Sequence, residues 1–95
     1  MPEITIEELK KHLDEVNLID VREIEEFDQG HIEQARNIPL STLEYQLDAF
    51  DPAKTYHVIC RSGKRSARAG DILEQRGIKT VNVTGGMLAW EETVE

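Results

Sequence analysis

Cysteine is scarce in this 95-residue sequence, which contains a single one, Cys60. One cysteine excludes an internal disulfide and a Cys-x-x-Cys redox pair. Long apolar runs are missing too, and residues 1–4 carry no basic segment, so we expect neither a signal peptide nor a membrane span. These features predict a cytoplasmic protein, in which reducing conditions keep a thiol free.

Basic residues are also outnumbered. The chain has 11 Lys and Arg against 19 Asp and Glu, a formal net charge of −8. Such an excess of negative charge argues against nucleic acid or an anionic membrane as a partner. The 39% of hydrophobic residues still predict a folded protein. Because the sequence has no linker, repeat or low-complexity segment, we expect residues 1–95 to form one domain.

Short segments rich in β-formers alternate with segments of helical periodicity. The predicted strands cover residues 3–5, 16–21, 35–38, 56–59 and 80–83. The predicted helices begin at residue 6 and then cover residues 23–28, 41–50 with Ser41 as cap, 67–76 and 87–94. This alternation predicts an α/β fold with a mostly parallel sheet between helices on both faces.

The one cysteine opens a loop between a predicted strand and a predicted helix. The loop, residues 60–66, reads Cys-Arg-Ser-Gly-Lys-Arg-Ser. Four cations occur in or beside it: Arg61, Lys64, Arg65 and Arg68. Loop amides and the positive end of the helix dipole would converge on the thiol, and such surroundings favour thiolate and bind anions. The sequence therefore predicts a nucleophilic cysteine in an anion-binding loop.

A buried apolar cysteine is the alternative interpretation, because a lone cysteine often serves as a small hydrophobe. The basic neighbours argue against it, and so does Gly63, since a glycine lets backbone amides approach a bound group closely. The four cations could instead form a solvated face, and Gly63 could be an ordinary turn glycine.

Several stretches together resemble the rhodanese family. They occur in the family's order along nearly the whole chain, at residues 18–23, 30–32, 35–39, 60–66 and 85–86 with Trp90. The resemblance implies a single-domain rhodanese with a five-stranded parallel sheet and sulfurtransferase activity. It implies that Cys60 takes the outer sulfur of thiosulfate, or of a similar small anionic donor, and passes it from a persulfide to cyanide or a thiol. No cofactor is implied, and the three histidines share no ligand spacing for a metal.

The resemblance also assigns roles within the loop. The amides of residues 61–65 would hold the persulfide sulfur, with Gly63 allowing their close approach. Ser62 and Ser66 could donate hydrogen bonds to the sulfur or its leaving group. For Ser66 we expect instead a role as the cap of the following helix.

The charged residues receive separate expectations. Arg65 would hold a sulfonate or stabilise the loop itself, whereas Arg61 would point toward the incoming substrate. Lys64 could attract substrate or remain solvated. Asp20 and Arg22, at the end of a predicted strand, are expected to form a supporting ion pair rather than to act as catalysts.

Three functions stay open at this point. The first is the sulfurtransferase already described. The second is a sulfur-carrier or sensor module that exchanges persulfide sulfur with a partner protein and turns over small donors slowly. The third is a phosphatase or arsenate-reductase-like enzyme. Residues 60–65 span six positions, whereas the related phosphatases use a loop one residue longer that fits phosphate, so the shorter loop favours sulfur.

Overall fold

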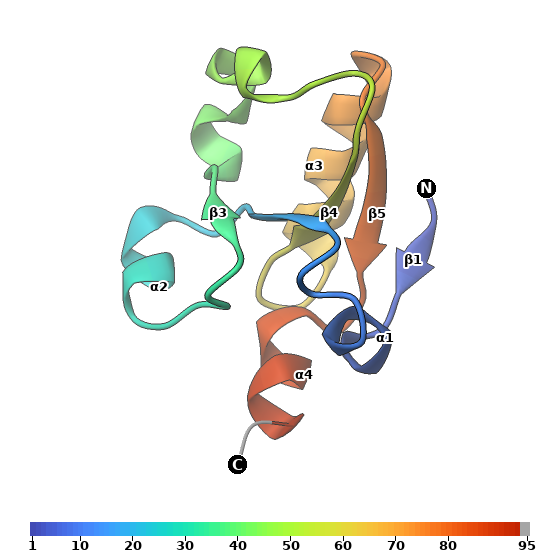
Figure 1. The fold of residues 1–95 in the computed structure, drawn as a ribbon. Coiled ribbons are helices and arrows are strands. Elements are labelled where there is room, and N and C mark those ends of the chain that lie inside the picture. Colours follow the sequence, from blue (N-terminus) through green and yellow to red (C-terminus); the bar gives the residue numbers. More distant parts are fainter. Residues whose placement is uncertain (94–95) are drawn as a thin grey trace.

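Five parallel strands form one sheet in the part of the chain that the structure, a computed structural model, describes, residues 1–93 (Figure 1). Their bounds are β1 Glu3–Ile4, β2 Asn17–Asp20, β3 Arg36–Asn37, β4 Thr55–Ile59 and β5 Lys79–Val83. The order across the sheet is β1-β5-β4-β2-β3, and every pairing is parallel. The predicted five-stranded parallel sheet is therefore confirmed, with β4 at its centre.

The side chains of β4 alternate between the two faces of the sheet. Tyr56 and Val58 pack in the apolar cluster on one face, and Ile59 packs in the cluster on the other. All three are buried. A strand buried on both faces reads as a short run of β-formers, which is why the sequence identifies it.

Helices cover both faces of the sheet. Their bounds are α1 Ile6–Lys10, α2 Ile24–Asp28, α3 Lys64–Gln75 and α4 Gly86–Thr93, with two 3-10 helices, η1 Leu40–Tyr45 and η2 Leu47–Ala49. α3 and η1 contribute Leu73 and Leu43 to one apolar cluster, while α1 and α4 contribute Leu9 and Met87 to the other. The predicted three-layer α/β fold is confirmed (Figure 1). The last residue predicted for the final helix, Val94, lies outside the described residues.

The prediction of one helix over residues 41–50 is wrong. The two 3-10 helices divide this stretch at Gln46, whose φ of −123° and ψ of 25° are not helical. Ser41 does not cap a helix here, because its hydroxyl donates to Glu23 Oε1 at 2.6 Å. The Gln46 N–H closes a tight turn by donating to Leu43 O at 3.0 Å. The 3-10 helix still buries Leu43 completely. The spacing of the apolar residues alone therefore could not distinguish a 3-10 helix from the predicted α-helix.

Candidate active site

The loops that follow β4, β2 and β5 lie at the same edge of the sheet, because the carboxyl ends of parallel strands point the same way. Cys60 comes directly after β4 and Arg22 two residues after β2. Thr84 follows β5, and Gly85 and Gly86 come next, with α4 beginning at Gly86. The structure thus brings together three of the stretches that carry the sequence resemblance.

The sulfur of Cys60 faces the loop that follows it. Cys60 is only 1% exposed and borders the apolar cluster under α3, as the alternative interpretation expected. Its Sγ nevertheless accepts the Gly63 N–H at 3.1 Å, and Ser66 Oγ lies 3.4 Å away. Gly63 has a φ of +107°, a conformation that glycine adopts without strain and that turns its amide toward the sulfur. Cys60 is therefore a buried residue whose sulfur also contacts polar groups of the loop.

These donors change the acidity of the thiol. Burial raises the pKa of Cys60, but hydrogen bonds from the Ser66 hydroxyl and from the amides of Ser66, Gly63 and Ser62 outweigh it, so the pKa lies below its ordinary value. The groups that lower the pKa most are neutral dipoles of the loop. This direction agrees with the predicted thiolate-favouring amides, and a nearby cation acts in the same direction, because Arg65 and the Cys60 thiolate attract each other electrostatically.

Ser66 does not cap α3, contrary to the expectation. The helix begins earlier, at Lys64, and its N-cap position is Gly63. Ser66 lies inside the first turn and is fully buried. Its Oγ lies 3.1 Å from Gly63 O and 2.5 Å from Oδ1 of Asn82, a residue of β5. The hydroxyl therefore does not cap an N–H of the helix start, and it lies instead among the sulfur, the Gly63 carbonyl and Asn82.

Arg65 binds Glu26 of α2. Its Nη1 and Nη2 contact Glu26 Oε1 and Oε2 at 2.6 and 2.8 Å, a bidentate pair. The hydrogen bond from Arg65 is the main reason that the pKa of Glu26 falls to about 2. Of the two roles expected for Arg65, this geometry supports stabilisation of the loop, because the guanidinium fork is already occupied by a carboxylate.

Asp20 and Arg22 form the buried ion pair that the sequence predicts. Arg22 Nη2 lies 2.8 Å from Asp20 Oδ2, and Arg22 Nε donates to both carboxylate oxygens at 3.1 Å. Arg22 Nη2 also donates to Gly30 O at 2.8 Å. The pair therefore connects the end of β2 to the turn after α2 and supports one side of the site.

Gly86 allows α4 to pack directly against the start of the cysteine loop. The Met87 and Leu88 amides donate to the carbonyls of Cys60 and Arg61 at 2.8 and 3.0 Å. A Cβ on Gly86, where φ is +54°, would lie 2.4 Å from Cys60 O. Gly86 is thus explained by a close backbone approach, whereas a Cβ on Gly85 would lie 2.8 Å from Ala89 Cβ, and the sequence analysis missed both roles.

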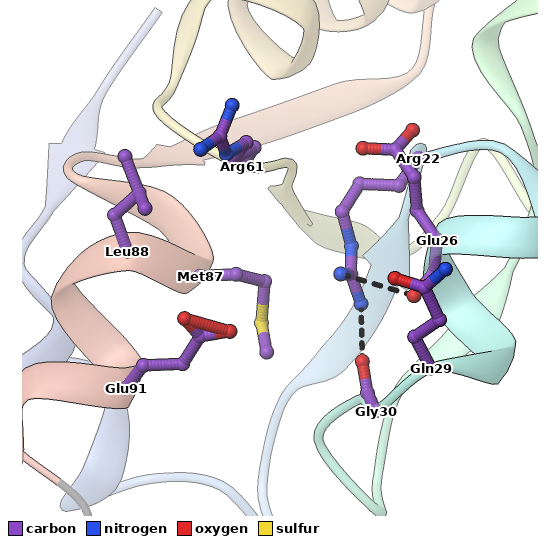
Figure 2. Close-up of a pocket in the computed structure, with 8 residues that line it drawn as sticks. All are labelled: Arg22, Glu26, Gln29, Gly30, Arg61, Met87, Leu88 and Glu91. Atoms are coloured by element: carbon purple, nitrogen blue, oxygen red, sulfur yellow. Dashed lines mark hydrogen bonds between the residues drawn. The ribbon is translucent and has the colours of Figure 1, made fainter.

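A cavity of about 300 Å³ opens beside this loop, between α2 and α4 (Figure 2). Its lining includes Arg22, Glu26, Gly30, Arg61, Met87 and Glu91. Figure 2 shows the α4 residues on one side and those of the β2–α2 region on the other. Arg61 is the residue of the loop that lines this cavity, whereas Lys64 and Arg68 are exposed.

Asn82 is the buried residue of the site that the sequence analysis did not identify. It is 4% exposed and lies in β5, where its side chain contacts Ser66 and Gly63. The only signal in the sequence is a carboxamide between two valines of a predicted strand. Among residues 1–93, no three His, Cys, Asp or Glu side chains come together as metal ligands, and no helix is long and apolar enough to cross a membrane.

Comparisons with known proteins agree with this geometry. The family model described as a rhodanese-like domain matches residues 5–93. "Putative sulfurtransferase YtwF" of Bacillus subtilis is 45% identical over 92 residues, which cover 94% of this chain and 89% of that protein. "Putative sulfur carrier protein YrkF" of the same organism is 36% identical over all of this chain and 54% of its own length. The crystal structure of a rhodanese-like domain protein from Staphylococcus aureus superposes with a TM-score of 0.91 at 43% identity, covering 95% of this chain and 91% of that one.

Proposed function

We propose a function from one premise: the chain belongs to the rhodanese-like domain family. Its relatives include a protein named as a putative sulfurtransferase, and the site contains a single thiol surrounded by hydrogen-bond donors. We infer that the chain is a sulfurtransferase that carries a sulfane sulfur on Cys60 between a small anionic donor and a thiophilic acceptor.

The proposed reaction has two displacement steps. The Cys60 thiolate attacks the outer sulfur of thiosulfate, a new S–S bond forms, and sulfite leaves with the electron pair of the old one. Cyanide or a thiolate then attacks the outer sulfur of the persulfide. That step yields thiocyanate or a new persulfide and returns the electron pair to Cys60 as thiolate. No oxidant or reductant is consumed, so the atoms and electrons balance.

The observation that carries this proposal is the orientation of the buried sulfur toward the loop amides. Gly63 N–H meets Sγ at 3.1 Å, and the pKa of Cys60 lies below its ordinary value although burial raises it. Fixed dipoles of this kind stabilise an anion without rearranging when it forms. They would serve both the attacking thiolate and the outer sulfur of the persulfide, which is also an anion.

Arg61 is the cation that we assign to donor attraction. It is exposed, it follows the nucleophile in the chain, and it lines the cavity beside the loop. In a protein with a net charge of −8, a local cation of this kind draws a small anion to one place. The other loop arginine, Arg65, is paired with Glu26 and would hold the loop in shape instead.

Incubation with thiosulfate followed by intact mass measurement tests the proposal. We expect the protein to gain the mass of one sulfur atom and to lose it again on addition of cyanide. Cys60→Ser should gain none, because serine cannot form a persulfide. A wild-type protein that takes up no sulfur, or a Cys60→Ser variant that transfers sulfur at the wild-type rate, would overturn it. Cys60-dependent hydrolysis of an aryl phosphate would favour the phosphatase alternative instead.

A sulfur carrier that exchanges sulfur with a partner protein is the second candidate. It is favoured by the relative named as a putative sulfur carrier protein, of which this chain covers 54%. A persulfide that persists on the intact protein, together with negligible turnover of thiosulfate and cyanide, would distinguish the carrier from the enzyme.

A further inference from the structure

Asn82 binds the two loop residues that contact the sulfur. Its Nδ2 donates to Gly63 O at 3.3 Å, and Ser66 Oγ lies 2.5 Å from its Oδ1. Gly63 in turn donates its N–H to Cys60 Sγ, and Ser66 Oγ lies 3.4 Å from that sulfur. A side chain of β5 is therefore connected to the candidate nucleophile through both of its polar atoms.

The hydroxyl of Ser66 has one proton and three acceptors within reach. They are Asn82 Oδ1 at 2.5 Å, Gly63 O at 3.1 Å and Cys60 Sγ at 3.4 Å. A carboxamide oxygen only accepts hydrogen bonds, so the shortest contact directs the proton to Asn82. Ser66 then presents only lone pairs to the sulfur. A thiol can donate its S–H to those lone pairs, but a thiolate gains nothing from them.

We propose that Asn82 is a positioning residue for Cys60: its Oδ1 competes with the sulfur for the single hydroxyl proton of Ser66. The inference rests on the proposed function only in taking Cys60 as the nucleophile. When the S–H proton leaves for solvent, the Ser66 hydroxyl rotates from Oδ1 to the thiolate, where a hydrogen bond to a charge is stronger. Asn82 thus holds part of the resting sulfur as thiol, while its bond to Gly63 O keeps the loop in place.

The test compares Asn82→Ala, Ser66→Ala and the double variant. The readouts are the ultraviolet absorbance of the thiolate and the pH dependence of alkylation by iodoacetamide, and both report on Cys60 because the chain has no other cysteine. Thr80→Val is the matched control, since Thr80 is a buried polar residue of the same strand whose hydroxyl donates to Glu74. Sulfur transfer is not needed for either readout, so a failure of the proposed function would be seen separately, as the absence of sulfur uptake.

We expect Asn82→Ala to lower the pKa of Cys60, giving about three- to tenfold more thiolate at a pH below that pKa. Ser66→Ala should raise the pKa, and Asn82→Ala should have no effect in the Ser66→Ala background. A higher pKa in Asn82→Ala, or an equal shift with and without Ser66, would mean that Asn82 only supports the loop and would overturn the inference. If Asn82→Ala does not fold, Asn82→Leu replaces it, because leucine keeps nearly the same shape without the acceptor oxygen. The same lowered pKa is then expected, and a raised one would again overturn the inference.

Discussion

Replacing Glu26 by glutamine removes the charge that ties α2 to the start of α3. The carboxylate accepts hydrogen bonds from both arms of the Arg65 guanidinium, at 2.6 and 2.8 Å. Glutamine keeps the size of the side chain but offers one oxygen and no charge. The variant therefore isolates the ionic part of this contact from its packing.

The expected change in the free energy of unfolding follows from the pKa of Glu26, which lies at about 2 instead of 4.5. A difference of that size corresponds to about 3 kcal/mol at full strength. The side chains of Arg65 and Glu26 are 34% and 35% exposed, however, so solvent screens the pair. We therefore expect Glu26→Gln to lower the free energy of unfolding by about 1 kcal/mol at neutral pH.

The stabilisation by Glu26 depends on pH. Because the pKa of Glu26 is lower in the folded protein, its contribution is complete above pH 4.5 and is lost as the pH falls through about 2. Urea unfolding should therefore show a difference between wild type and Glu26→Gln that is largest at neutral pH and shrinks as the pH is lowered. Glu25→Gln, an exposed neighbour on the same helix, is the control and should change little. A difference that is independent of pH, or equal in both variants, would show that the ion pair is not the cause.

Two further variants test the supports of the site. Asp20→Asn leaves the buried Arg22 charge without its carboxylate and should lower the free energy of unfolding by about 3–5 kcal/mol, measured in urea; a loss below about 1 kcal/mol would contradict a supporting ion pair. Gly86→Ala places a Cβ 2.4 Å from Cys60 O and should both destabilise the fold and shift the pKa of Cys60. Gly77→Ala is its control, because Gly77 also has a positive φ but nothing within 4 Å of the added carbon; equal effects in the two variants would mean that backbone strain alone is responsible.

The sequence predicts the fold well because its signals are local. The strand β4 is a compact run of β-formers, Cys60 follows it directly, and Gly63 marks the turn that brings the amides to the sulfur. The Asp20–Arg22 pair was also predictable, since the two residues are only two positions apart at a strand end. Each of these features depends on a few neighbouring residues.

What the sequence did not reveal depends on contacts between distant segments. Arg65 finds its carboxylate on α2, 39 positions away, so its role could not be read from the loop alone. Ser66 looked like a helix cap, but Gly63 takes that position and the Ser66 hydroxyl bonds to Asn82, 16 positions further on. Ser41 likewise donates to Glu23 instead of capping a helix. In each case the shortest contact of the polar side chain is with a residue distant in the sequence, and not with its own loop or helix end.

The two amides of α4 that bind the carbonyls of Cys60 and Arg61 also fix the direction of the peptide groups to which those carbonyls belong. In a trans peptide the N–H points opposite to the C=O, so a carbonyl held outward turns the following amide inward. The last helix thus sets the direction of the Arg61 and Ser62 amides, and the Ser62 amide is one of those that lower the pKa of Cys60. Changes near the end of the domain should therefore alter the chemistry of a thiol more than 25 positions earlier in the chain.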